Sequence, residues 1–210
     1  MEKPENFREN PVWLFSLAAS LALLLVTFFQ WSLIDWLTVF LFPLLLFILW
    51  VNFLGAAIWS VVYFLIHLKR WRVSLPPVMV CAVTLALLYF VPFTKLWLDL
   101  DFVLYKSARE ELVEQVLNNT LKPNVSHNPD LIALPWHAPR VSMGGNEIVV
   151  EKHEGITYVF FYTFRGILDN YSGFLYVPKG GRPEKFSDLN ETDSTQLVRL
   201  DDHWFYVSHH

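Results

Sequence analysis

The stretch PVWLFSLAASLALLLVTFF, from Pro11 to Phe29, contains no charged residue. A helix needs about 20 mostly apolar residues to cross a hydrocarbon core of about 30 Å, and this stretch has nearly that length. Its end lacks the small-residue pattern of a signal-peptide cleavage site, and another apolar stretch follows at once. We therefore interpret Pro11–Phe29 as an uncleaved membrane crossing.

Two further apolar stretches follow, Leu37–His67 and Val73–Thr94. As a helix, the first of these would be about 46 Å long at about 1.5 Å per residue, which exceeds one bilayer but is too short for two crossings. We predict a single long helix that is tilted or kinked near Pro43, and its division into two helical segments stays open. Pro92 predicts a kink near the end of the other stretch. Residues 1–97 are thus expected to form an anchor with three crossings.

Positively charged residues are distributed unevenly around these crossings. The link from Gln30 to Trp36 has none, whereas five lie before the first crossing or between the second and third: Lys3, Arg8, Lys69, Arg70 and Arg72. The positive-inside rule places these five on the cytoplasmic side, so that residues 98–210 lie outside the cytoplasm. Three cations directly after the third crossing argue for the opposite orientation: Lys95, Lys106 and Arg109.

Asp, Glu, Lys, Arg and His are missing from the middle of all three stretches. A conduction or proton path through the membrane normally uses buried Asp, Glu, Lys, Arg or His, so the sequence disfavours a transporter or channel. Ser16 and Ser20 instead give the first stretch a face of small residues, which is typical of helix packing. We interpret this half as an anchor and a possible surface for homo-oligomers.

The second half of the chain is polar enough to fold in water. From Leu98 onward it has ten Lys and Arg against sixteen Asp and Glu, a net charge of about −6. An acidic domain repels phosphate backbones, so nucleic acid is not an expected partner. Cys81 is the only cysteine of the chain, which excludes an intramolecular disulfide.

Hydrophobic periodicity in this half changes from about 3.6 residues to 2 after residue 130. It predicts a helix over Leu98–Asn119, which either continues from the third crossing as a rigid stalk or packs on the core of the domain. The alternation then predicts six strands separated by turn residues. They are Leu131–Pro135, Glu147–Lys152, Ile156–Phe164, Gly173–Val177, Gln196–Leu200 and Trp204–Ser208. The expected fold is a small α+β domain with a mostly antiparallel sheet, attached to three transmembrane helices.

The most distinctive segment is FRGILDNYSGF, from Phe164 to Phe174. It resembles a stretch found in uncharacterised bacterial membrane proteins that combine transmembrane helices with a small β-rich tail. The resemblance covers little beyond this segment and the helix before it. It implies the architecture and brings no reaction, ligand or cofactor with it.

Four residues of this segment form a candidate binding loop: Arg165, Asp169, Asn170 and Tyr171. Arg and Tyr are favoured in interface hot spots, which suggests a recognition surface. The competing interpretation is a purely structural turn, in which Gly166 and Gly173 permit sharp bends and Arg165 pairs with Asp169.

Catalytic signatures are missing from the sequence. It has no Gly-x-Ser-x-Gly, no His-Glu-x-x-His, no cysteine pair and no glycine-rich phosphate loop. We therefore expect no catalytic residue, no metal site and no cofactor, and a membrane-bound hydrolase is the least favoured function.

Two functional hypotheses remain. The preferred one is a bacterial inner-membrane protein whose extracytoplasmic domain binds another membrane or periplasmic protein in an accessory, assembly or protective role. Its aromatic residues support it, because some large rings in so small a domain should stay at the surface: Trp136, Tyr162, Tyr171, Tyr176, Trp204 and Tyr206. The alternative is a sensor or small-ligand domain, which predicts an enclosed apolar pocket with a few convergent polar groups.

Overall fold

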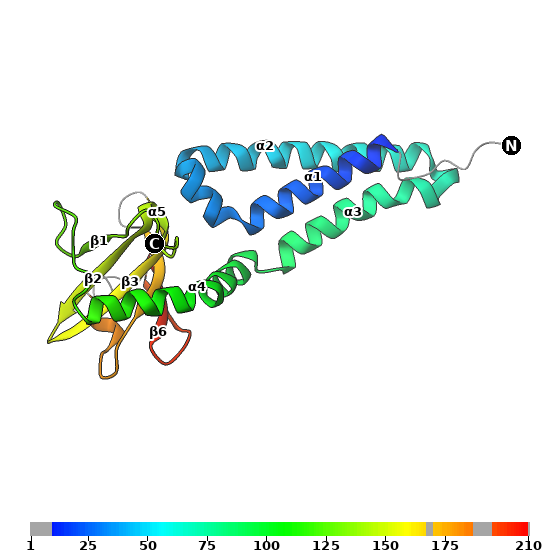
Figure 1. The fold of residues 1–210 in the computed structure, drawn as a ribbon. Helices are drawn as coiled ribbons and strands as arrows, with labels where there is room; N and C mark the ends of the chain where they lie inside the picture. Colours follow the sequence, from blue (N-terminus) through cyan, green and yellow to red (C-terminus); the bar gives the residue numbers. More distant parts are fainter. Residues whose placement is uncertain (1–9, 167–169, 187–194, 210) are drawn as a thin grey trace. The chain divides into compact units, whose positions relative to one another are not determined.

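The computed structural model describes residues 10–166, 170–186 and 195–209. The chain divides into two compact units: a helical unit, Met1–Trp97, and a sheet unit, Leu98–His210. Figure 1 shows both, with the helices of the first in blue to green and the strands of the second in yellow to red. Helices and an antiparallel sheet are thus both present, as the sequence predicts.

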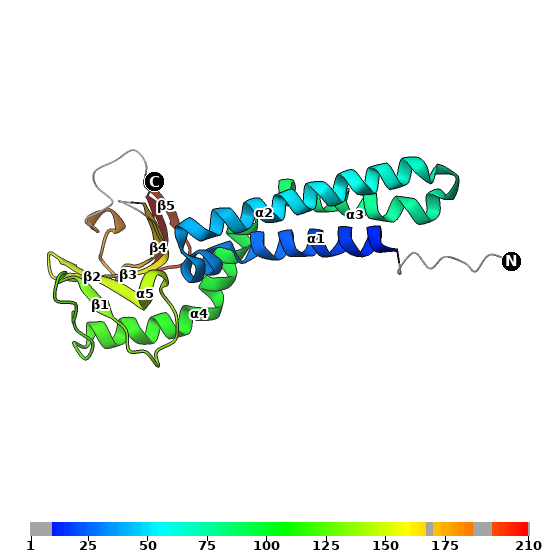
Figure 2. The same ribbon diagram turned by 90° about the horizontal axis from the view of Figure 1, so that it is seen from above.

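The helical unit contains three long helices that pack against one another (Figure 2): α1 (Pro11–Phe28), α2 (Gln30–Ile66) and α3 (Trp71–Phe90). All three are long and apolar enough to cross a membrane. The Asn10 side chain caps α1 by accepting a hydrogen bond from the Val12 amide at 2.9 Å, and Pro11 occupies the first turn, where its missing amide costs nothing. A short 3-10 turn, η2 (Leu68–Arg70), joins α2 to α3.

Helix α2 begins earlier than predicted and breaks at an unexpected residue. The expected link Gln30–Trp36 is itself helical, and the backbone leaves helical geometry at Thr38, with φ 76° and ψ 159°. The helix continues through Pro43, where the kink was predicted. Thr38 therefore divides α2 into a short first segment and a second segment of roughly 28 residues, about 42 Å long.

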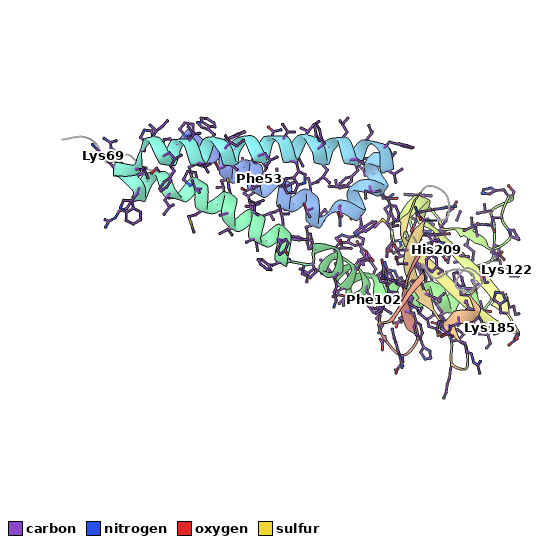
Figure 3. The ribbon with its side chains drawn as sticks, turned by 180° about the vertical axis from the view of Figure 1, so that it is seen from behind. Phe53, Lys69, Phe102, Lys122, Lys185 and His209 are labelled. Atoms are coloured by element: carbon purple, nitrogen blue, oxygen red, sulfur yellow. The ribbon has the colours of Figure 1, made fainter. Side chains whose placement is uncertain are left out.

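The interior of the helical unit combines a few large side chains with small polar ones. Leu23, Phe53 and Cys81, one from each helix, are buried together, and Figure 3 shows Phe53 between the helices. Beside them the Ser16 and Ser60 hydroxyls lie 2.7 Å apart and join α1 to α2. Small residues let the helix backbones approach closely, which is how helices associate in lipid.

A break separates α3 from the next helix, α4 (Phe93–Leu117). Val91 has extended geometry, with φ −90° and ψ 120°, because the ring of Pro92 disfavours a helical conformation in the residue before it. Of the two alternatives for this helix, direct continuation from the third stretch is therefore wrong, and packing on the core of the domain is confirmed. Pro92 ends one helix instead of kinking it.

The sheet unit contains one antiparallel sheet in the order β1-β2-β3-β4-β6-β5. Neighbouring strands along the chain pair as hairpins except at β4, which pairs with β6 and leaves β5 at the edge. The bounds of the strands are β1 (Leu131–Ala133), β2 (Glu147–His153), β3 (Ile156–Arg165), β4 (Tyr171–Tyr176), β5 (Thr195–Arg199) and β6 (Trp204–His209).

Both faces of this sheet are covered. Helix α4 lies across one face, where Leu112 and Val116 pack with Ile148, Phe161 and Phe174. A second cluster covers the other face. There a short 3-10 turn, η3 (Pro183–Lys185), places the buried ring of Phe186 nearly parallel to Phe160, with centroids 5.5 Å apart.

Gly173 lies inside β4 and does not form the sharp bend that the sequence suggested. A Cβ atom on this residue would lie 2.2 Å from the Phe161 carbonyl oxygen and 2.4 Å from the Phe160 ring. The register of β3 against β4 shifts between Tyr162 and Phe164, next to this point. Gly173 is therefore required for close packing of Phe160 against the sheet.

Candidate functional site

Two connections leave the same end of the sheet. Residues 134–146 join β1 to β2, and residues 166–170 join β3 to β4. Ala133 pairs with Glu147 and Arg165 with Tyr171, so both connections start where these strand pairs end. The candidate loop predicted from the sequence therefore shares its end of the sheet with the longer β1–β2 connection.

Arg165 is half-exposed and held by its neighbours. Its guanidinium donates to the Glu147 carboxylate at 2.7 Å and lies 5.2 Å from the centre of the Tyr162 ring. The aliphatic part of the side chain passes over Gly144, where an added Cβ would lie 3.0 Å from the Arg165 Cβ. The predicted partner, Asp169, lies outside the described residues, so that pairing stays a prediction.

Asn170 and Tyr171 differ in exposure. Asn170 is exposed, and its carbonyl accepts a hydrogen bond from the Gly166 amide at 2.8 Å, which closes the connection. Tyr171 is partly buried and stacks on His209 with ring centroids 5.6 Å apart. Of the predicted loop, Arg165 and Asn170 therefore face solvent, while the Tyr171 ring belongs to the packing of the sheet.

The β1–β2 connection is fixed by a buried hydroxyl and an asparagine at the short helical turn α5 (Met143–Asn146). The Ser142 hydroxyl accepts from the Tyr162 amide at 2.9 Å and donates to the Glu147 carbonyl at 2.5 Å. The Asn146 side chain accepts from the Val141 amide at 3.2 Å and donates to the Pro139 carbonyl at 3.1 Å. These contacts tie the connection to β3 and to the start of β2.

Trp136 is the most exposed large apolar side chain of the described residues, at 96%. It lies on a turn closed by a hydrogen bond of 2.9 Å from the Ala138 amide to the Pro135 carbonyl. Proline on both sides, at 135 and 139, further restricts the backbone. The sequence suggested that some rings of this domain stay exposed, and the two flanking prolines were the signal that could have singled out Trp136.

The other end of the sheet unit carries an acidic cleft of about 550 Å³. Its carboxylates come from two elements, α4 and the β5–β6 turn: Glu110, Glu114, Asp201 and Asp202. Burial, and secondarily the Glu110 carboxylate, raises the pKa of the Tyr176 hydroxyl in its wall. Lys106 neutralises part of this charge through its ion pair with Asp201.

A buried ion pair inside α4 was not predicted. Arg109 is 1% exposed and reaches back two turns of the helix to the Asp101 carboxylate at 2.5 Å. Its guanidinium also donates to the Val141 carbonyl at 3.1 Å and covers the Phe174 ring at 4.5 Å. Burial raises the pKa of Asp101, and Arg109 opposes that rise; burial likewise lowers the pKa of Arg109.

The helical spacing of the sequence could have indicated this buried ion pair. Arg109 falls four residues after Tyr105 and three before Leu112, on the face of α4 that packs on the sheet. It also contacts the β1–β2 connection at Val141, so the pair anchors that connection to α4. We assign it a structural role, because its charged groups are directed at each other and away from solvent.

The histidines of the domain have separate environments. His153 contacts Glu151 at 3.1 Å, His203 contacts the Val177 carbonyl at 3.0 Å, and His209 stacks on Tyr171. Within the described ranges, no group of three His, Cys, Asp or Glu is placed to hold a metal ion.

The chain matches no protein-family model, no curated protein and no solved structure.

Proposed function

We propose that this protein is an integral membrane protein whose extracytoplasmic domain binds another membrane or periplasmic protein. The recognition surface, called here the Trp136 surface, consists of Trp136, Arg165 and Asn170. The protein acts as an accessory, assembly or protective factor of a bacterial inner membrane, without a reaction of its own.

The exposed side chains of the helical unit support membrane insertion. Large apolar residues such as Phe40, Phe47 and Ile58 point outward from α2. Soluble proteins do not leave a continuous apolar surface of this kind in water. Lipid tails provide the apolar surroundings that these side chains need.

The proposed sidedness rests on how the positive residues group. The Asn10 side chain donates to the Tyr63 hydroxyl at 2.6 Å, which brings the start of α1 to the end of α2 that leads into Lys69 and Arg70. Figure 3 shows Lys69 at this end of the helical unit. The positive-inside rule places it in the cytoplasm, and a long following domain is exported largely regardless of its charge.

The 96% exposure of Trp136 carries the proposal of protein binding. An indole in water gains substantial free energy when a partner covers it, and Trp and Arg are among the residue types most enriched in hot spots. The turn around Trp136 and the side chain of Arg165 are both held by internal contacts. A surface already ordered before binding loses little conformational entropy on association.

Site-specific photocrosslinking in native membranes tests this proposal. A photoreactive amino acid at position 136 or 170 should give a discrete adduct with a second protein, whereas one at Lys179, beyond the opposite end of β4, should not. Trp136→Ala should abolish the adduct formed from position 170, and His137→Ala should preserve it. An adduct of twice the chain mass would identify a homo-oligomer; equal adducts from all positions would refute the Trp136 surface.

A fusion tests the sidedness separately. A reporter enzyme that is active only outside the cytoplasm should be active when attached after His210. Activity of a cytoplasmic reporter at the same position would refute the proposed orientation and with it a periplasmic partner.

The sensor hypothesis ranks second because of the lining of the acidic cleft. Its volume of about 550 Å³ lies within the size range of small-ligand sites. Four carboxylates line it, however, whereas ligand pockets are mostly apolar with few polar groups. A rise in melting temperature with a cationic ligand such as a polyamine, abolished by Glu114→Gln, would favour the sensor.

A further inference from the structure

One face of α4 changes its chemistry along the helix. Leu100, Val103 and Leu104 lie on it at helical spacing and are 44%, 72% and 64% exposed. The same face continues through Ser107 to Glu111, which are exposed polar residues. The apolar part, Leu100, Val103 and Leu104, is called here the α4 apolar face.

The opposite face of this part of α4 packs on the sheet. Phe102 packs against Phe174 and Trp204 of the sheet, with ring centroids 5.2 and 5.8 Å apart, and Asp101 is buried in its ion pair with Arg109. Figure 3 shows Phe102 where α4 meets the sheet. The first half of α4 therefore carries large apolar side chains on the side away from the sheet as well, next to the exposed charges Lys95 and Asp99, and this outward apolar surface needs a cover.

We propose that the bilayer interface covers the α4 apolar face, so that the first half of α4 lies among the lipid headgroups and holds the domain at the membrane surface. This inference rests on the proposed membrane crossing of α3. That helix ends at Phe90 and α4 starts at Phe93, so covalent connection keeps Leu100 and Leu104 close to the exit of the last crossing. Along α4, they lie only about 10 to 17 Å from Phe93.

The gradient along the helix favours lipid over a protein partner. Leu104 and Glu111 are separated by about 10 Å along the axis, which is more than the headgroup layer of about 5–8 Å on each side of a bilayer, so the helix can pass from lipid to water between them. An interfacial helix buries its apolar face about 5–10 Å deep at the boundary of headgroups and acyl chains and turns its charged face to water. A helix that passes from lipid into water needs side chains that become more polar with distance from the last crossing.

Depth-dependent fluorescence quenching tests this inference in the full chain. Cys81→Ala provides a background for single cysteines at Leu100, Val103, Leu104, Ser107 and Glu111, each carrying an environment-sensitive dye in vesicles of phosphatidylcholine and phosphatidylglycerol. Lipids with brominated chains should quench the dye at the first three positions and not at Glu111, and aqueous iodide should show the reverse. Val103→Glu with Leu104→Glu should cause loss of lipid quenching at Leu100.

Controls separate the possible failures. A cysteine at Leu54, an exposed residue in α2, reports membrane insertion itself. Lipid quenching at Leu54 with iodide quenching at Leu104 would overturn the interfacial position while the crossings stand. Absence of lipid quenching at both would overturn the proposed membrane anchor as well. Protection of Leu104 only in native membranes would overturn the lipid assignment, because it would show that a protein covers this face.

Discussion

The helical unit leaves many large apolar side chains exposed, whereas the sheet unit buries most of the large apolar side chains of its strands. In the helical unit, Ala56 and Ser60 are buried, while Phe90 is 77% exposed. In the sheet unit, Phe161 and Phe174 are buried between the sheet and α4. The two units of one chain therefore differ in how far their large apolar side chains are exposed.

Such a difference is expected where two units fold in different solvents. In water, burial of apolar surface drives folding, at about 25 cal/mol per Å². Between lipid tails this driving force would be absent, and close approach of small residues together with hydrogen bonds such as Ser16–Ser60 would determine packing. The comparison supports membrane insertion of the helical unit. Single substitutions in each unit can test whether the two units differ in this way.

The largest effect is expected from Phe161→Ala compared with Phe90→Ala. Removal of a buried ring from the core should lower the free energy of unfolding of the sheet unit by about 4 kcal/mol, through lost burial and the cavity that remains. Phe90→Ala should change it by less than about 0.5 kcal/mol, as surface substitutions do. Hydrogen exchange of the β3 and β4 amides in the full-length protein measures both. Equal losses of unfolding free energy in the two variants would contradict the difference between the two units.

The buried ion pair should give the next largest effect. Asp101→Asn leaves the Arg109 guanidinium charged and buried, at a cost of about 3 kcal/mol by the same hydrogen-exchange measurement. Arg109→Met should cost less, because the Asp101 carboxyl can take up a proton. A double substitution, Asp101→Leu with Arg109→Met, should recover much of the loss.

The pH dependence of Arg109→Met follows from the raised pKa of Asp101. Without its partner, that carboxyl keeps only the burial that raises the pKa above the ordinary value of 3.8. The folded state then binds its proton at a higher pH than the unfolded state, so the stability of this variant should rise as pH falls toward 3.8. A flat difference between Arg109→Met and Asp101→Leu with Arg109→Met across pH 4 to 7 would show that Asp101 does not titrate there.

Substitution of one glycine in each unit should show the same difference through a smaller change in stability. Gly173→Ala should cost about 2 kcal/mol, because the new Cβ meets the Phe161 carbonyl and the Phe160 ring. Gly55→Ala in α2 should be neutral or stabilising, because apart from its chain neighbours and the nearby backbone of α2 no atom lies within 4 Å of the position that the new methyl group would occupy. Thermal unfolding of both variants in detergent measures the difference. A destabilised Gly55→Ala protein would indicate a contact that forms at this position.

The smallest effect is expected at the exposed pair of Lys106 and Asp201. Lys106 lowers the pKa of Asp201 below 3.8, so the pair stabilises the fold above that pH and the contribution is lost as pH falls through the lowered pKa. Asp201→Asn should therefore slightly lower the melting temperature at pH 7 and leave it unchanged near pH 2. High salt should reduce the difference, because exposed ion pairs are screened.

Much of the sheet unit could be predicted because its signals are local. Alternation of apolar and polar residues and turn residues such as Gly155 placed all six strands within two residues of their bounds. The helix of this unit was placed from Leu98, whereas α4 starts at Phe93, because Pro92 ends the previous helix and fits immediately before a new one. The antiparallel pairing followed from short connections.

The features that escaped prediction depend on contacts between distant residues. Thr38 is β-branched, and such residues rarely adopt a positive φ, so its φ of 76° could not be expected from the sequence. Arg109 carries a charge that normally indicates an exposed position, and its burial requires Asp101, Val141 and Phe174 together. In the candidate loop, the sequence identified exposed Arg165 and Asn170 but not the packing of Tyr171.

The interruption at Val91 and Pro92 limits what the helical unit can transmit along the chain. A continuous helix can carry torsion or a piston-like shift from one side of a bilayer to a domain beyond it, whereas a helix that ends and restarts loses the hydrogen bonds that make it stiff. We therefore expect this joint to pass on torsion or a piston-like shift less well than an unbroken helix would.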